Sequence, residues 1–117
     1  MDGELSADEL EAILGDDGLR IVDIRNPSAF DRGHIPDSEN IPFNELPQEV
    51  EQLAGADRVV TVCPHGQASQ QAARLVASYE GIGDDARVDS LQCGIEGWPG
   101  DLERSTDDEG PETDAPF

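Results

Sequence analysis

Apolar residues near the start of the chain follow first a helical and then a strand pattern. Ser6 and Glu9 have the spacing of a capping box, and the helix that they open carries three apolar residues on one face, namely Leu10, Ile13 and Leu14. The run from Arg20 to Ile24 predicts a short buried strand, because Ile and Val dominate it. Asn26-Pro27 then predicts a break and a short turn of helix.

The pattern between residues 33 and 53 is weaker. Gly-His-Ile-Pro at 33–36 predicts a loop, since the residue before a proline avoids the helical conformation. Residues 41–43 predict a brief extended segment, and residues 44–53 predict a helix.

The clearest pattern lies between residues 58 and 91. Residues 58–62 read Arg-Val-Val-Thr-Val, a strong strand signal, and Cys63 follows directly. A helix is predicted over 69–79, with apolar residues at helical spacing on one face, namely Ala68, Ala72, Leu75, Val76 and Tyr79. Residues 87–91 predict the last strand, and 94–98 a loop or short helix. Strands that alternate with helices predict an α/β fold with a parallel sheet.

The length of 117 residues suits one domain. We expect this domain to occupy residues 1–100, because from Asp101 onward the chain is almost free of apolar residues. Residues 101–117 are therefore predicted to form an acidic, disordered tail.

The net charge of −20 excludes several classes of function. Phosphate neutralisation needs a basic patch, so nucleic acid is an unsuitable partner. Anionic membrane surfaces are unsuitable for the same reason. The acidic start resembles no signal peptide, and no stretch approaches the roughly 20 apolar residues of a membrane span. We expect a cytoplasmic protein whose two cysteines, Cys63 and Cys93, are free thiols.

Carboxylates are spread along the whole chain, which contains no Lys at all. This composition is typical of proteins adapted to high intracellular salt, although an ordinary acidic protein is the alternative. Added KCl should screen the repulsion between carboxylates and so stabilise the compact state. We expect the melting temperature to rise between dilute buffer and molar KCl. An unchanged melting temperature would contradict the halophilic interpretation.

Cys63 lies where a buried strand meets a helix. In open parallel sheets ligands bind beyond the carboxyl ends of the strands. The following helix directs free N–H groups and the positive end of its dipole toward the loop, and both favour a thiolate. Gly66 allows the loop N–H groups to curl around the sulfur. Position alone leaves a second interpretation open, in which Cys63 packs as a small apolar residue.

Three segments resemble the rhodanese family. Residues 22–43 match its first signature through a set of motif positions, namely Asp23, Arg25, Phe30, Gly33, His34, Ile35, Pro36, Asn40, Ile41 and Pro42. Residues 63–69, Cys-Pro-His-Gly-Gln-Ala-Ser, resemble the family's active-site loop. Residues 91–98 are similar to its C-terminal Leu-x-Gly-Gly-x-x-x-Trp signature.

The resemblance implies a rhodanese-like fold, with a central, mostly parallel five-stranded sheet flanked by helices on both faces. It also implies transfer of sulfane sulfur from a small-molecule donor, such as thiosulfate or a persulfide, to a thiol or cyanide acceptor. Cys63 would carry the persulfide, cradled by Pro64, His65, Gly66, Gln67, Ala68 and Ser69. Asp23, Arg25 and His34 would support the loops. Neither a cofactor nor a metal is implied, and a sulfur-carrier protein is a further candidate partner.

The active-site loop departs from the family in lacking an Arg near its end. Gln67 and Ala68 stand there, so the backbone must bind the anion, with His65 as the one ionisable helper or as a solvent-facing residue with no role. Cysteine-based phosphatases need Arg six positions after the cysteine to clamp the phosphate. Ser69 occupies that position and argues against phosphoryl chemistry.

Cys93 replaces the first Gly of the C-terminal signature. We hypothesise that it resolves the Cys63 persulfide or forms a disulfide with Cys63, the alternative being a neutral replacement. A non-catalytic module that binds a partner or senses sulfur species is the competing function for the whole chain. Inactive modules of the family usually lack the loop cysteine, so Cys63 favours chemistry.

Overall fold

The computed structural model describes residues 3–79, 81–82, 86–100 and 102–104. Its sheet consists of five parallel strands, namely β1 (Gly3–Leu5), β2 (Leu19–Asp23), β3 (Ser38–Asn40), β4 (Arg58–Val62) and β5 (Arg87–Leu91). Their order across the sheet is β1-β5-β4-β2-β3, which places β4 at the centre. The predicted α/β class and five-stranded parallel sheet are confirmed.

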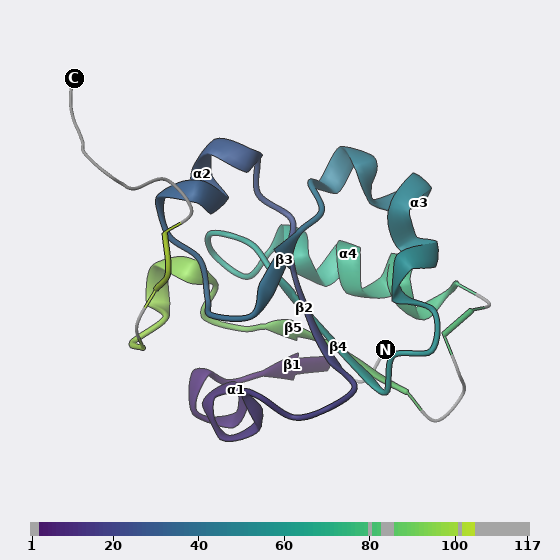
Figure 1. Cartoon of the computed structure of the whole chain (residues 1–117), viewed down its shortest axis with the longest axis horizontal. Coiled ribbons are helices and arrows are strands. Elements are labelled where there is room, and N and C mark those ends of the chain that lie inside the picture. Colours follow the sequence, from purple (N-terminus) through teal and green to yellow (C-terminus); the bar gives the residue numbers. More distant parts are fainter. Residues whose placement is uncertain (1–2, 80, 83–85, 101, 105–117) are drawn as a thin grey trace.

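Helices cover both faces of the sheet (Figure 1). α1 (Ala7–Ile13) lies on one face, and α3 (Leu46–Glu49) and α4 (Ala68–Ala77) lie on the other. Each face has its own apolar cluster, and the residues of β4 alternate between the two. Val59 and Cys63 belong to the cluster under α4, whereas Val60 and Val62 belong to the cluster on the α1 side. This alternation assigns the Cys63 side chain to the α4 face.

The two edge strands are the elements that the side-chain pattern does not predict. β1 and β3 have three residues each, with the sequences Gly-Glu-Leu and Ser-Glu-Asn. Backbone pairing with β5 and β2 holds them in place, and this pairing needs no alternation of side chains. The expected extended segment at 41–43 is wrong in position, because β3 ends at Asn40 and a 3-10 turn begins at Phe43.

The predicted helix over 44–53 is divided into three short pieces. A 3-10 turn, η1 (Phe43–Glu45), is followed by α3 and by a second 3-10 turn, η2 (Val50–Leu53). Leu46, Val50 and Leu53 nevertheless face the core as a helical spacing predicts. Among the described residues, no helix is long and apolar enough to cross a membrane.

Residues 102–104 make contacts beyond the expected end of the domain. The His34 N–H donates to the Glu103 carbonyl at 2.9 Å, and the Glu103 N–H donates to the His34 carbonyl at 2.7 Å. Leu102 packs against Gly33. The ordered contacts therefore pass residue 100, while residues 101 and 105–117 of the predicted tail lie outside the described residues.

Candidate active site

Cys63 directly follows the central strand β4 and begins the loop that leads into α4. Figure 1 shows β4 and α4. The Gly66 N–H donates to Cys63 Sγ at 3.0 Å, which closes the loop around the sulfur. Only 2% of Cys63 is exposed to solvent. The sulfur is therefore buried, but it faces backbone N–H groups on one side.

A buried chain of hydroxyls continues from the sulfur. Ser69 Oγ lies 3.3 Å from Cys63 Sγ and 2.6 Å from Ser90 Oγ on β5. Thr61 Oγ1 donates to the Ser69 carbonyl at 2.6 Å, which fixes the first turn of α4 over β4. When Cys63 is ionised, the Ser69 hydroxyl donates to the sulfur and the Ser90 hydroxyl can donate to Ser69 in turn. The arrangement stabilises negative charge on the sulfur.

These contacts decide the ionisation of the thiol. Burial by itself raises the pKa of Cys63, but hydrogen bonds from the Ser69 hydroxyl and from the Ser69, His65 and Gly66 backbone outweigh it. The pKa of Cys63 is consequently lowered from its ordinary value. The lowered pKa favours the nucleophilic thiolate over the inert buried thiol.

The turn after β5 packs against the Cys63 loop and is hydrogen-bonded to it. The Ile95 N–H donates to the Cys63 carbonyl at 2.9 Å, and the Glu96 N–H donates to the Pro64 carbonyl at 3.0 Å. Gly66 adopts φ +82°, and a Cβ at that position would overlap the Gln92 carbonyl oxygen. Glycine is therefore required where the loop meets this turn.

The remaining loop residues differ in exposure. Pro64, His65 and Gln67 are exposed, and Ala68 is half-buried at the start of α4. The His65 side chain has no hydrogen bond or ion pair among the described residues. Its backbone N–H contributes to lowering the pKa of Cys63. Pro64, His65 and Gln67 thus present their side chains to solvent.

Asp23 and Arg25 form a buried pair beside the site. Arg25 Nη2 lies 2.7 Å from Asp23 Oδ2 and donates to the Gly33 carbonyl at 2.6 Å. Asn40 Nδ2 donates to the carbonyls of Asp23 and Arg25 at 3.0 and 2.9 Å. These contacts tie the end of β2 to the neighbouring loop and to β3, and the supporting role of Asp23 and Arg25 stays a prediction.

His34 is held away from solvent by its neighbours. Its Nδ1 lies 2.8 Å from the Phe30 carbonyl oxygen, and its ring stacks on Phe30 with centroids 3.9 Å apart. Such contacts bridge α2 (Pro27–Arg32) to the following loop. The supporting role of His34 stays a prediction.

Cys93 differs from Cys63 in surroundings and in ionisation. It packs against the apolar cluster on the α1 side of the sheet, whereas Cys63 belongs to the α4 side. Burial raises the pKa of Cys93. Both cysteines are free thiols in this structure. A thiol with a raised pKa is a weaker nucleophile at neutral pH, and the resolving role of Cys93 stays a prediction.

Sequence reasoning did not identify Thr61 and Ser90 as parts of the site. Both are wholly buried hydroxyls in strands, and nothing in the sequence separates them from ordinary polar strand residues. The register of β4 and β5 brings them together by pairing Thr61 with Ser90. The pairing register of β4 and β5 is therefore the information needed to identify Thr61 and Ser90 as parts of the site.

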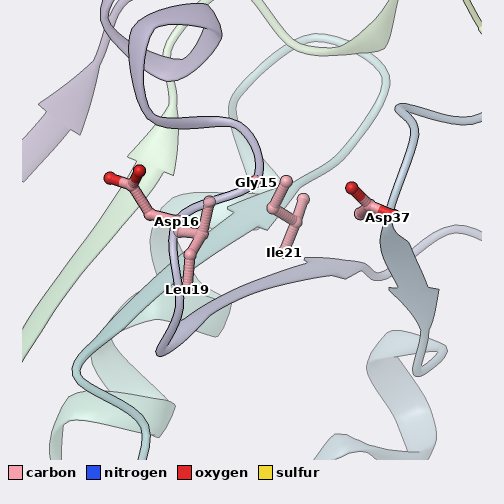
Figure 2. Close-up of a pocket in the computed structure, with 5 residues that line it drawn as sticks. All are labelled: Gly15, Asp16, Leu19, Ile21 and Asp37. Carbon is pink, nitrogen blue, oxygen red and sulfur yellow. The ribbon is translucent and has the colours of Figure 1, made fainter.

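A cavity of about 230 Å³ has no residue of the Cys63 loop in its lining (Figure 2). Leu19 and Ile21 of β2 and Gly15 line it, and Asp16 and Asp37 supply its charged groups. None of these five side chains is a thiol, imidazole or amine. Among the described residues, no group of three or more His, Cys, Asp or Glu is arranged to hold a metal ion. The Cys63 loop remains the stronger candidate site.

Replacing Ser69 by alanine is expected to raise the pKa of Cys63, because the variant loses the hydroxyl that stabilises the thiolate. The pH at which half of Cys63 is ionised should increase. The rate at which Cys63 reacts as a nucleophile at neutral pH should fall about tenfold, the size expected for a lost hydrogen bond to a charged group. Ultraviolet absorbance of the thiolate during a pH titration measures the shift. Ser78→Ala, at the other end of α4, is the control. Identical titrations of S69A and the wild type would contradict this role.

A parallel α/β domain with a stabilised thiolate at the carboxyl edge of its sheet defines a class of cysteine-dependent group-transfer proteins. The chain belongs to the rhodanese-like domain family, whose sequence profile matches residues 6–101. It is 32% identical over 94 residues to a protein of Tolumonas auensis named thiosulfate sulfurtransferase GlpE, an alignment that covers 80% of this chain and 85% of the relative. The corresponding protein of Pseudomonas aeruginosa is 38% identical over 88 residues, which cover 73% of this chain and 74% of the relative.

Two further similarities concern a sulfur carrier and a solved structure. A Bacillus subtilis protein named putative sulfur carrier protein YrkF is 28% identical over 93 residues, which cover 80% of this chain and 48% of that protein. The crystal structure of a rhodanese-like domain protein from Staphylococcus aureus superposes with a TM-score of 0.74 at 26% identity, covering 91% of this chain and all of that one. These similarities confirm the rhodanese-like fold and support a function within the sulfurtransferase family.

Proposed function

We propose that this protein is a sulfurtransferase that moves sulfane sulfur from a donor to a thiol or cyanide through a persulfide on Cys63. One observation carries the proposal: Cys63 Sγ is hydrogen-bonded to the Gly66 N–H and to the Ser69 hydroxyl, and these contacts help to lower the pKa of the thiol. The names of the sulfurtransferase relatives support the same chemistry.

In the first half-reaction the Cys63 thiolate attacks the outer sulfur of the donor. With thiosulfate, a bond forms between Cys63 Sγ and the sulfane sulfur, the S–S bond of thiosulfate breaks, and sulfite leaves with the bonding electron pair. The negative charge then resides on the outer sulfur of the persulfide. N–H groups of the loop can stabilise this charge as they stabilise the thiolate.

In the second half-reaction a thiolate or cyanide attacks the outer sulfur. A new bond forms to the acceptor, the S–S bond of the persulfide breaks, and the Cys63 thiolate is regenerated. The same hydrogen bonds stabilise it as a leaving group. A sulfur-carrier protein is a candidate acceptor, in keeping with the name of the B. subtilis relative.

The burial of Cys63 places a condition on both steps. Because only 2% of the residue is exposed, donors and acceptors have restricted access to the sulfur. Pro64, His65 and Gln67 are the exposed members of the loop. Between encounters, the closed loop would keep solvent thiols away from the persulfide.

The production of thiocyanate from cyanide tests this function. The protein is incubated in dilute buffer and in molar KCl with thiosulfate or with an organic persulfide, and thiocyanate is assayed after cyanide is added. We expect catalytic turnover with at least one donor. If no sulfane donor yields thiocyanate under either condition, the proposal fails and a non-catalytic binding or sensing module takes its place.

A further inference from the structure

A cavity of about 310 Å³ adjoins the Cys63 loop at the carboxyl edge of the sheet. Its walls come from α2, from Pro64 in the loop, from the 3-10 turn η3 (Ile95–Gly97) and from Leu102. These segments gather at one edge of the molecule in Figure 1. Pro64 directly follows Cys63, so a molecule in the cavity lies against the backbone that holds the sulfur.

The cavity contains an arginine side chain that has no partner among the described residues. Arg25 also lines it, but the guanidinium of Arg25 is bound to Asp23 and Gly33. Arg32 lines the same cavity, and its side chain has no hydrogen bond or ion pair among the described residues. In a chain with 27 acidic and seven basic residues, an unpaired guanidinium in a cavity that the loop residue Pro64 also lines favours an anionic ligand.

The other walls of the cavity suit an organic ligand better than an inorganic anion alone. Ala29, Ile95 and Leu102 offer apolar surface to the same space. Leu102 is 44% exposed and is the one large apolar side chain that stands exposed among the described residues. Pockets for small organic ligands begin at about 300 Å³, so the cavity has room for a carbon chain as well as a charged group.

We propose that this cavity binds the carbon-containing part of an organic persulfide or thiol that bears a carboxylate, with Arg32 pairing with that carboxylate. The proposal rests on the proposed function and specifies its substrate class. The Cys63 thiolate attacks the outer sulfur of the donor R–S–SH, the S–S bond of the donor breaks, and the carrier leaves as R–S⁻. The proton stays with the transferred sulfur, and Arg32 holds the carrier throughout.

Two donors that differ in one group test the proposal. They are the persulfides of N-acetylcysteine, which has a carboxylate, and of N-acetylcysteine amide, which has none. For the wild type we expect kcat/KM to be about fivefold higher with the carboxylate donor, or ~1 kcal/mol, the value of an exposed ion pair. Arg32→Gln should abolish the preference, and rising KCl should weaken it in the wild type.

Two variants serve as matched comparisons. Arg74→Gln removes an exposed Arg from the last turn of α4, away from the cavity, and should keep the full preference. Glu96 is an exposed carboxylate in the cavity wall that repels an anionic ligand, so Glu96→Gln should increase the preference.

The outcomes separate this proposal from the proposed function. If the wild type accepts sulfur from both persulfides with equal kcat/KM, or if R32Q lowers both values equally, the assignment of the cavity is overturned while sulfur transfer stands. If neither persulfide nor thiosulfate loads Cys63, the proposed function itself fails.

Discussion

Replacing Cys63 by serine is expected to reduce sulfur transfer to the level of the uncatalysed reaction. The serine hydroxyl is too weak an acid to supply an oxyanion nucleophile in this loop, and it cannot hold a sulfane sulfur. The fold should survive, because serine is slightly smaller than cysteine and can take over the contact with the Ser69 hydroxyl. We expect a loss of about 1 kcal/mol in the free energy of unfolding, an ordinary value for one substitution. Thiocyanate production and chemical denaturation measure the two effects.

Cys93→Ser is the matched control for this variant. Cys93 packs with the cluster on the α1 side, and burial raises its pKa, so its removal should leave turnover close to that of the wild type. Residual activity in C63S would refute the assignment of the nucleophile. Loss of activity in C93S would instead support the resolving role hypothesised for Cys93.

Gly66→Ala is expected to have the second largest effect, on activity and stability together. The added Cβ would overlap the Gln92 carbonyl oxygen, so either the loop or the turn after β5 must move. Movement of the loop takes the Gly66 N–H away from Cys63 Sγ. The thiolate then loses one of its donors, and activity at neutral pH should fall by about tenfold or more. The steric overlap adds to the ordinary cost of a positive φ, for a total of about 2–4 kcal/mol.

Gly55→Ala separates backbone strain from steric overlap. Gly55 has φ +85°, close to the +82° of Gly66, but nothing lies within 4 Å of the position of its added Cβ. This variant should lose only about 1–2 kcal/mol, the cost of a left-handed conformation, and should keep full activity. Equal effects of the two substitutions on turnover and stability would contradict the role assigned to Gly66.

The sequence predicts the centre of the site better than its surroundings. The β-branched run at 58–62 predicts the strand, and Gly66 predicts the tight loop that follows it. Both predictions depend on the conformational preferences of the residues themselves. β1 and β3 have no such signature, since pairing with β5 and β2 decides their conformation. Ser90 enters the site through strand register, and tertiary packing brings Leu102 and Arg32 to the lining of one cavity. Contacts between segments distant in sequence cannot be derived from the spacing within either segment.

The acid-rich composition affects how these experiments are performed. With 27 acidic and seven basic side chains, the protein repels itself and its anionic donors at low ionic strength. Salt screens both effects but also weakens the proposed pairing of Arg32 with a carboxylate. Activity and donor preference therefore need to be measured across a range of KCl concentrations.

Mass analysis of the thiosulfate-treated protein tests the central claim most directly. After alkylation, trypsin releases residues 59–74 with Cys63 and residues 88–104 with Cys93, because Arg residues precede and end both segments. We expect the mass of one added sulfur atom on peptide 59–74, and we expect cyanide treatment before alkylation to remove it. Added sulfur on peptide 88–104 alone, or on neither peptide with thiosulfate or any persulfide donor, would contradict a persulfide carried by Cys63.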